Sequence, residues 1–208
     1  MLDAFASFMQ AMYDCFERQV KMKLKILLSV IFSAFPLLVS AQMLRNENLS
    51  FEIPSDFIEG ANLSRAGLTF FEYVPRTESV RNWTKMLTVQ VLHGFPARGM
   101  TGDRFQNLFA EQMRQSCPGS ESRQIETGVV NSYNFQLWQN YCPLSSLTRR
   151  AEFFISKTID GADSLYIIQY TFTSAPSEAK ISEAKEYLRT IFVCDTRIAS
   201  RPCSLGRQ

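Results

Sequence analysis

Short runs of alternating apolar and polar residues recur along this 208-residue chain, and residues that favour turns separate them. Alternation with a period of two is the pattern of a β-strand that has one buried face. The runs predict strands at residues 49–54, 67–75, 87–92, 123–130, 133–141, 152–159 and 164–172. Because these runs are short and closely spaced, they favour a mostly antiparallel sheet of about six to seven strands.

Two helices are predicted to flank this sheet. Thr101 can cap a helix that runs to about Gln115, and a second helix is expected near residues 177–190. Apolar residues recur at helical spacing in both segments, so each presents one apolar face. Residues 191–194 are predicted either as a last short strand or as the end of the second helix. The predicted fold class is therefore α+β, with the sheet flanked by two helices.

Two dipeptides predict tight turns between neighbouring strands. Asn131-Ser132 is expected to join the strands on either side of it. Asp160-Gly161 is a preferred pair for a two-residue type I′ turn, which would make a hairpin of the strands around it.

Residues 22–42 show the order of features that a secretory signal peptide requires. Two lysines form a basic end, residues 26–39 are almost wholly apolar, and Val39 and Ala41 form a cleavage box. The apolar run has 14 residues, whereas a membrane-spanning helix needs about 20. We expect cleavage after Ala41, a signal peptide at residues 22–41, and no membrane span in the mature chain. The alternatives are a buried apolar helix and an uncleaved anchor.

Residues 1–21 precede this signal and are expected to be either a wrongly assigned translation start or an N-terminal extension. Their apolar residues follow helical spacing, so the extension would be an amphipathic helix. With a wrongly assigned start, Cys15 would not belong to the protein. The mature chain, residues 42–208, is predicted to be a single disulfide-stabilised α+β domain of 167 residues.

The charge of the mature chain argues against two classes of partner. Residues 1–41 hold four of the 22 basic and three of the 20 acidic side chains, which leaves a net charge of +1. This balance gives no reason to expect a nucleic acid or an anionic membrane as partner. The sequence also lacks a phosphate-binding glycine loop, a dinucleotide fingerprint and a calcium loop. We therefore expect no cofactor, and an unidentified protein or small ligand as partner.

Four cysteines remain in the mature chain: Cys117, Cys142, Cys194 and Cys203. An even number in an exported chain indicates two disulfides, for which three pairings exist. Cys117–Cys142 and Cys194–Cys203 are favoured because each pair joins near neighbours in the sequence. A metal site and a redox-active pair are the alternatives, but the sequence contains no C-x-x-C motif and only one histidine.

Two resemblances follow from the order of these features. The element order of residues 49–193, with the opening Phe51-Glu-Ile-Pro54, resembles the α/β/α topology of PsbP-like proteins, which are mostly assembly or binding modules. The chain also resembles a family of small exported proteins of Gram-negative bacteria that has no assigned function. The strings that carry this second resemblance are Asn82-Trp83-Thr84, Cys117-Pro118-Gly119, Cys142-Pro143, Asp163-Ser-Leu-Tyr166, and Cys194-Asp195 through Cys203.

Few residues offer catalytic chemistry. His93 is the only histidine, and it lies between a predicted strand and Gly94, where catalytic residues often occur. A hydrolase would also need a nucleophile and a carboxylate, or a pair of carboxylates such as Glu72 and Glu152. No G-x-S-x-G elbow is present. His93 is therefore expected to be a surface or half-buried residue, with a role in ligand contact as the alternative.

Trp83 is the second candidate contact residue. It precedes a predicted strand in a polar context, so a partly exposed indole there can anchor a ligand or partner. The alternative is a tryptophan that packs over the core at the end of the strand. Trp138 lies within an alternating run and is expected in the core.

The sequence favours a periplasmic or secreted domain that binds an unknown ligand or partner without covalent chemistry. No catalytic residue and no metal ligand is assigned. The alternatives are a secreted hydrolase of unusual type that uses His93 or a carboxylate pair, and an envelope inhibitor or immunity-type protein.

Overall fold

The computed structural model describes residues 46–65, 67–146 and 148–203, and Leu44–Gln208 forms one compact unit. The predicted signal peptide, its cleavage site and Cys15 lie outside the described residues. The elements are β1 (Glu47–Ser50), β2 (Phe57–Arg65), β3 (Leu68–Pro75), β4 (Lys85–His93), the 3-10 helix η1 (Pro96–Arg98), α2 (Gly102–Ser116), β5 (Glu121–Val130), β6 (Tyr133–Cys142), β7 (Glu152–Asp160), β8 (Ser164–Phe172), α3 (Glu178–Thr190) and β9 (Phe192–Asp195). None of the helices in these ranges has the length and apolar character to cross a membrane.

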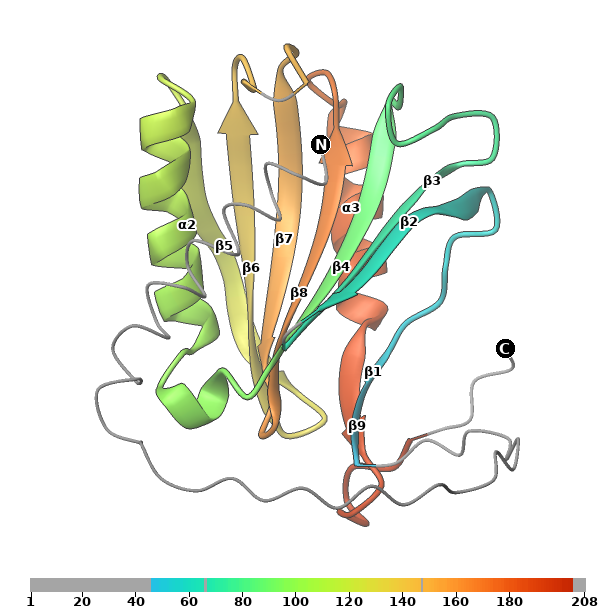
Figure 1. The fold of residues 1–208 in the computed structure, drawn as a ribbon, viewed down its shortest axis with the longest axis vertical. Coiled ribbons are helices and arrows are strands. Elements are labelled where there is room, and N and C mark those ends of the chain that lie inside the picture. The colour runs from blue at the N-terminus through green and yellow to red at the C-terminus, as the bar shows by residue number, and fades with distance from the viewer. Residues whose placement is uncertain (1–45, 66, 147, 204–208) are drawn as a thin grey trace, which may run out of the picture. The chain divides into compact units, whose positions relative to one another are not determined.

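Seven strands form one sheet in the order β2-β3-β4-β8-β7-β6-β5, and every neighbouring pair is antiparallel (Figure 1). β1 and β9 form a separate antiparallel pair. The predicted fold class is thus confirmed, including the two helices. Residues 191–194 fall in β9, so of the two readings the last strand is confirmed and the helix end is wrong.

The first part of the sheet differs from the prediction in two ways. The run predicted at residues 49–54 contributes only its start to β1, and it pairs with β9 instead of joining the main sheet. Strand β2 was not predicted at all. A bulge between Glu59 and Ala61 shifts its register, and most of its side chains are exposed at the edge of the sheet. The bulge and the exposure together remove the alternation by which buried strands are recognised.

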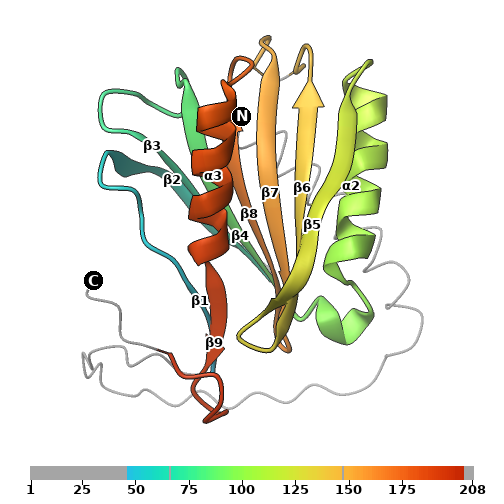
Figure 2. The ribbon, with the colours of Figure 1, turned by 180° about the vertical axis from the view of Figure 1, so that it is seen from behind.

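The two helices lie on opposite faces of the sheet. Register sets this arrangement, because successive residues of a strand point to opposite faces. On β7, Phe154 contacts Phe109 of α2, whereas the neighbouring Ile155 belongs to the cluster that packs under α3. α2 lies in front of the sheet in Figure 1, and α3 lies in front in the reverse view of Figure 2.

The face under α3 holds the main hydrophobic core. Side chains from all the central strands pack there against Ala184, Leu188 and Ile191. The segment between β1 and β2 covers the part of this face that α3 does not reach. In that segment, Phe51 lies with its ring centroid 6.1 Å from that of Tyr73. The backbone carbonyl of Glu52 accepts a hydrogen bond of 2.8 Å from the Tyr187 hydroxyl of α3.

A buried lysine fixes the C-terminal end of α3 to the sheet. Lys157 of β7 is 1% exposed, and its ammonium donates to the carbonyls of Leu188 and Ile191 at 2.9 and 2.6 Å. The carbonyls at the end of a helix lack intrahelical donors and carry partial negative charge, so they favour a cation. The ammonium also lies 4.7 Å from the centroid of the Phe135 ring. Burial lowers the pKa of Lys157 to about 8.

The connection between β7 and β8 is not the predicted two-residue turn. Asp160 pairs with Leu165 as part of the sheet, and neither Asp160 nor Gly161 has the positive φ that a type I′ turn needs. Instead, the Glu47 carboxylate accepts hydrogen bonds from the backbone N–H groups of residues 162, 163 and 164. A Cβ atom on Gly161 would collide with Glu47, so the carboxylate and the glycine together define the loop. The turn at Asn131-Ser132 is as expected, with φ values of 48° and 64°.

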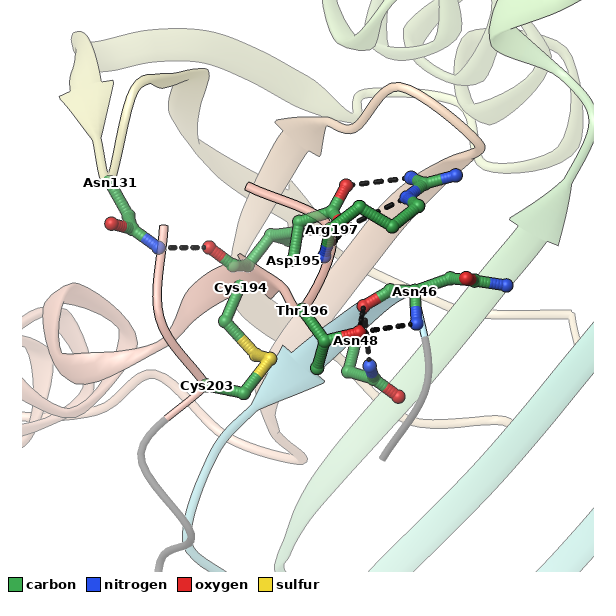
Figure 3. Close-up of a disulfide and its surroundings, with 9 residues drawn as sticks. Asn46, Asn48, Asn131, Cys194, Asp195, Thr196, Arg197 and Cys203 are labelled. Carbon is green, nitrogen blue, oxygen red and sulfur yellow. Dashed lines mark hydrogen bonds and ion pairs between the residues drawn. A yellow bond between two sulfur atoms is a disulfide. The ribbon is translucent and has the colours of Figure 1, made fainter. Parts of the chain in front are cut away.

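Both disulfides join the pairs that the sequence favoured. Cys117, which ends α2, is bonded to Cys142 at the end of β6. Cys194 of β9 is bonded to Cys203, which returns the C-terminal segment to the small sheet (Figure 3). Beside this bond, Asn131 donates to the carbonyl of Val193 at 2.8 Å and so ties the β5–β6 turn to β9.

Replacement of Lys157 by methionine is predicted to give a destabilisation that depends on pH. Burial lowers the pKa of Lys157 to about 8, from 10.5 for a lysine in water. Between these values the unfolded chain binds more protons, so Lys157 makes the free energy of unfolding rise with pH. In urea unfolding at pH 7, Lys157→Met should lose about 1–3 kcal/mol because two buried carbonyls lose their donor. The deficit should grow by about 2 kcal/mol at pH 9.5. A deficit that does not change with pH would contradict this account.

Candidate functional site

α2 covers only part of its face of the sheet. It packs on β5, β6 and β7. Within residues 46–65, 67–146 and 148–203, no α-helix lies over β2, β3, β4 and β8 on this side (Figure 1). Seven strands at a spacing of about 4.8 Å make a sheet about 29 Å wide, whereas one helix is about 10–12 Å across. We call the α2-side surface of β2, β3, β4 and β8 the open face because no described α-helix lies over it, although its polar residues Glu72, Thr88, Gln90 and Gln169 are buried in the full chain.

A row of polar side chains crosses this face. Glu72 of β3 lies opposite Thr88 of β4, and Thr88 lies opposite Gln169 of β8. Gln169 lies in turn opposite Ser156 of β7. We call these four residues the polar row. Gln90, two residues along β4 from Thr88, points to the same face.

Where α2 covers the polar row, its hydrogen bonds are made within the chain. Ser156 is fully buried, and its hydroxyl lies 3.0 Å from Nε2 of Gln106 on α2. Nδ2 of Asn140 lies 3.3 Å from the same oxygen. The N-terminus of α2 approaches the sheet closely here, because a Cβ atom on Gly102 would collide with the side chain of Thr158. This end of the row is therefore part of the core.

On the open face the polar groups lack such partners. In the full chain Gln90 is completely buried and Glu72 is 6% exposed. No described group forms a hydrogen bond to either amide atom of Gln90 or to Oε2 of Glu72. Burial raises the pKa of Glu72 to about 7. Any group that covers this face must therefore supply hydrogen bonds or leave costly unsatisfied polar atoms.

Apolar side chains flank the polar row on both sides. Towards one end of the strands, Val74 and Met86 pack with Trp83 in a small separate cluster. Towards the other end, Phe70 of β3 lies opposite Gln90 of β4, and Leu92 follows two residues further along β4. The open face therefore runs from an apolar band through the polar row to a second band, in which apolar side chains flank Gln90.

Trp83 is not the partly exposed residue that its polar sequence context predicted. It is 4% exposed, and its carbonyl accepts hydrogen bonds from Arg150 and Thr173 at 3.3 and 3.4 Å. The alternative, a tryptophan packed over the core at a strand end, is the correct one. Trp138 is 8% exposed and is part of the core as expected. A ligand contact through Trp83 would require local opening of the cluster.

His93 lies at the other end of β4, so the structure does not bring the two candidate contact residues together. It is an exposed residue, as expected from the sequence. Its Nε2 lies 2.9 Å from the Thr69 hydroxyl oxygen, and its Nδ1 lies 3.2 Å from the Ser164 hydroxyl oxygen. Burial of part of the ring lowers its pKa. Among the described residues no carboxylate forms a hydrogen bond to the ring, so the orienting group of a Ser-His-Asp triad is not supplied.

The two carboxylates considered for glycoside hydrolysis lie far apart. Glu72 is on β3 and Glu152 is on β7, and three strand spacings separate these strands. Three spacings amount to about 14 Å, whereas the paired carboxylates of glycosidases lie about 5–9.5 Å apart. Glu152 instead accepts a hydrogen bond of 2.6 Å from the Thr148 hydroxyl. These two residues therefore do not form a catalytic pair.

Sequence reasoning missed the site residues Thr88, Gln90 and Gln169. The run from Leu87 to Leu92 alternates cleanly, so its polar side is indistinguishable from an ordinary solvated face. Strand order, which places β4 in the middle of the sheet, is what makes that polar side unusual.

Trp83→Ala is predicted to destabilise the chain, because the side chain fills a buried cluster. Urea unfolding should show a loss of about 3–5 kcal/mol, and Trp83→Phe should lose less because it keeps an aromatic ring. If Trp83→Ala stays within about 0.5 kcal/mol of the unsubstituted chain, the indole does not support the fold and the binding hypothesis for Trp83 returns.

Comparisons with known proteins concern the fold alone. No protein-family model matches the sequence, and no curated protein is significantly similar to it. Among solved structures, cyanobacterial PsbP from Synechocystis sp. PCC 6803 is similar with a TM-score of 0.47 and 9% identity, over 72% of this chain and 94% of that chain. The Saccharomyces cerevisiae Ran-binding protein Mog1p has a TM-score of 0.40 and 10% identity, over 71% and 95%. LpqN of Mycobacterium tuberculosis, involved in cell envelope biogenesis, has a TM-score of 0.41 and 9% identity, over 72% and 84%. A PsbP structure is thus among the solved structures to which this chain is similar.

Proposed function

We propose that the mature chain, residues 42–208, is a periplasmic or secreted domain that binds a partner on its open face and performs no covalent chemistry. The observation that carries the proposal is the set of hydrogen-bonding atoms on Glu72 and Gln90 that no described group satisfies. A protein interior leaves few such atoms unpaired, and each costs free energy. A binding surface is the ordinary reason for a fold to retain them.

Export rests on two independent features. The first is the signal-like sequence of residues 22–42, with its basic end, short apolar run and small residues at the cleavage box. The second is the pairing of all four cysteines of the mature chain, Cys117 with Cys142 and Cys194 with Cys203. Disulfides persist in oxidising compartments and are rare in the cytosol.

The arrangement of catalytic groups favours binding over hydrolysis. Both ring nitrogens of His93 contact hydroxyl groups, and Glu72 lies too far from Glu152 to share a substrate bond with it. The polar row, by contrast, offers amide, hydroxyl and carboxylate groups that face one way on rigid neighbouring strands. Such a row can recognise a partner through hydrogen bonds without any chemical step.

Affinity capture with a matched pair of variants tests this proposal. The mature chain is recovered from the envelope fraction after export, and its N-terminus is sequenced, with Gln42 expected. Thr88→Arg places a long charged side chain in the middle of the polar row. Gln124→Arg makes the same change at the exposed far edge of the sheet, beyond α2. We expect at least one co-purifying molecule that Thr88→Arg loses at least tenfold and Gln124→Arg retains.

Two results would overturn the proposal. One is co-purification that is equally strong for both variants, which would place the binding surface elsewhere. The other is robust turnover by the mature chain in a hydrolase screen that His93→Ala abolishes, which would make the protein an enzyme.

A further inference from the structure

The size of the open face suits one particular kind of element. The distance from β8 to β2 is three strand spacings, or about 14 Å, and the diameter of a helix with its side chains is about 10–12 Å. The strands concerned have eight or nine residues, so they are about 27–30 Å long. One helix of about five turns would therefore cover this face, much as α2 covers the neighbouring half.

A further strand is a poorer fit to this protein than a helix. A strand would have to add at an edge of the sheet, beside β2 or β5. Both edge strands carry a register shift, between Glu59 and Ala61 in β2 and between Gln124 and Glu126 in β5. Such bulges interrupt the row of backbone groups with which an added strand must pair. The edges are thus protected, whereas the open face is not.

The chemistry along the face sets the pattern that such a helix must present. Val74 and Met86 form an apolar band at one end, and Phe70 lies opposite Gln90 at the other, with Leu92 two residues further along β4. The polar row lies between them, and successive bands are about 7 Å apart because side chains on one face recur every second residue. A matching helix is therefore apolar towards both ends of its inward stripe and polar at its middle.

Charge decides which polar group belongs at the middle. Glu72 is the acidic member of the polar row, and its neighbours across the strands are uncharged: Thr88, Gln169 and Ser156. A helix that covers Glu72 removes its carboxylate from water, which is costly unless a cation pairs with it. Lysine and arginine supply that cation from a long side chain that reaches the sheet.

We propose that the open face docks an amphipathic helix of a partner protein, whose inward stripe is apolar at both ends and carries one lysine or arginine that pairs with Glu72. The inference rests on the proposed function, because it names the partner for the same surface. The occupant that we assign to the open face is a protein helix. A small cationic ligand and an extended peptide are the other occupants that the test can reveal.

Selection from a library of helix-forming peptides displayed on phage tests this proposal. The target is the mature chain recovered after export, and peptides are eluted after competition with the unsubstituted chain. We expect enrichment of Lys or Arg at one inward position with apolar residues about one turn away on either side. A synthetic peptide from this selection should bind the chain at least tenfold more tightly than its Lys→Glu counterpart.

Charge reversal at Glu72 provides the matching test on the protein side. Glu72→Lys should weaken the selected peptide at least tenfold and should prefer the Lys→Glu peptide, because the ion pair is restored with opposite sense. Glu121→Lys, at an exposed position on the edge strand β5, should leave binding within twofold. Circular dichroism and the thermal midpoint of each variant show that the fold is kept. Glu72→Gln, which keeps the shape without the charge, should fall between the unsubstituted chain and Glu72→Lys.

Three results would overturn the inference. The first is a set of selected peptides without a preferred basic position. The second is peptide binding to Glu72→Lys that is as tight as binding to the unsubstituted chain. The third is peptide binding that Thr88→Arg does not weaken. None of these results contradicts the proposed function if Thr88→Arg still reduces capture of the partner from the envelope fraction. If capture also ignores Thr88→Arg, the proposed function fails with it.

Discussion

Coverage of the sheet is the constraint on which the rest of this structure depends. A seven-stranded sheet has two faces about 29 Å wide, and one helix covers about two or three strands. On one face, α3 and the segment around Phe51 together complete the cover and enclose the main core. On the other face, α2 covers β5, β6 and β7, and no described α-helix covers the open face.

The covered side is held by polar contacts at both ends of the chain, which make the sheet a rigid platform. Glu47, at the start of β1, binds three backbone N–H groups of the β7–β8 loop. Lys157 binds the carbonyls at the end of α3, and the Cys194–Cys203 bond secures the segment that follows β9. These contacts secure β1, α3 and β9 on the face opposite to the polar row.

Local patterns predicted most of the fold because the interactions behind them are local. Alternation gave the positions of six of the seven strands in the main sheet, and the capping role of Thr101 matches a helix that begins at the next residue. The prediction of a two-residue turn between β7 and β8 was wrong because Glu47, more than a hundred residues away, shapes that loop. Strand β2 was missed because an edge strand with a bulge lacks the alternation of buried and exposed residues by which strands are recognised. The open face depends on strand order, which no local pattern contains, so Thr88 and Gln90 read as ordinary solvated residues.

The most direct test of the central claim is the accessibility of the polar row in the mature chain. Thr88→Cys places a thiol in the middle of the open face, where Thr88 is 7% exposed in the full chain, and Thr158→Cys places one beneath α2, where Thr158 is 1% exposed. Each variant, recovered after export, is treated with a maleimide under native conditions and analysed by mass spectrometry. Rapid labelling is expected at residue 88, with protection at residue 158 until the chain unfolds. Equal protection of both thiols in the chain that begins at residue 42 would show that this face is closed and that no partner can reach the polar row.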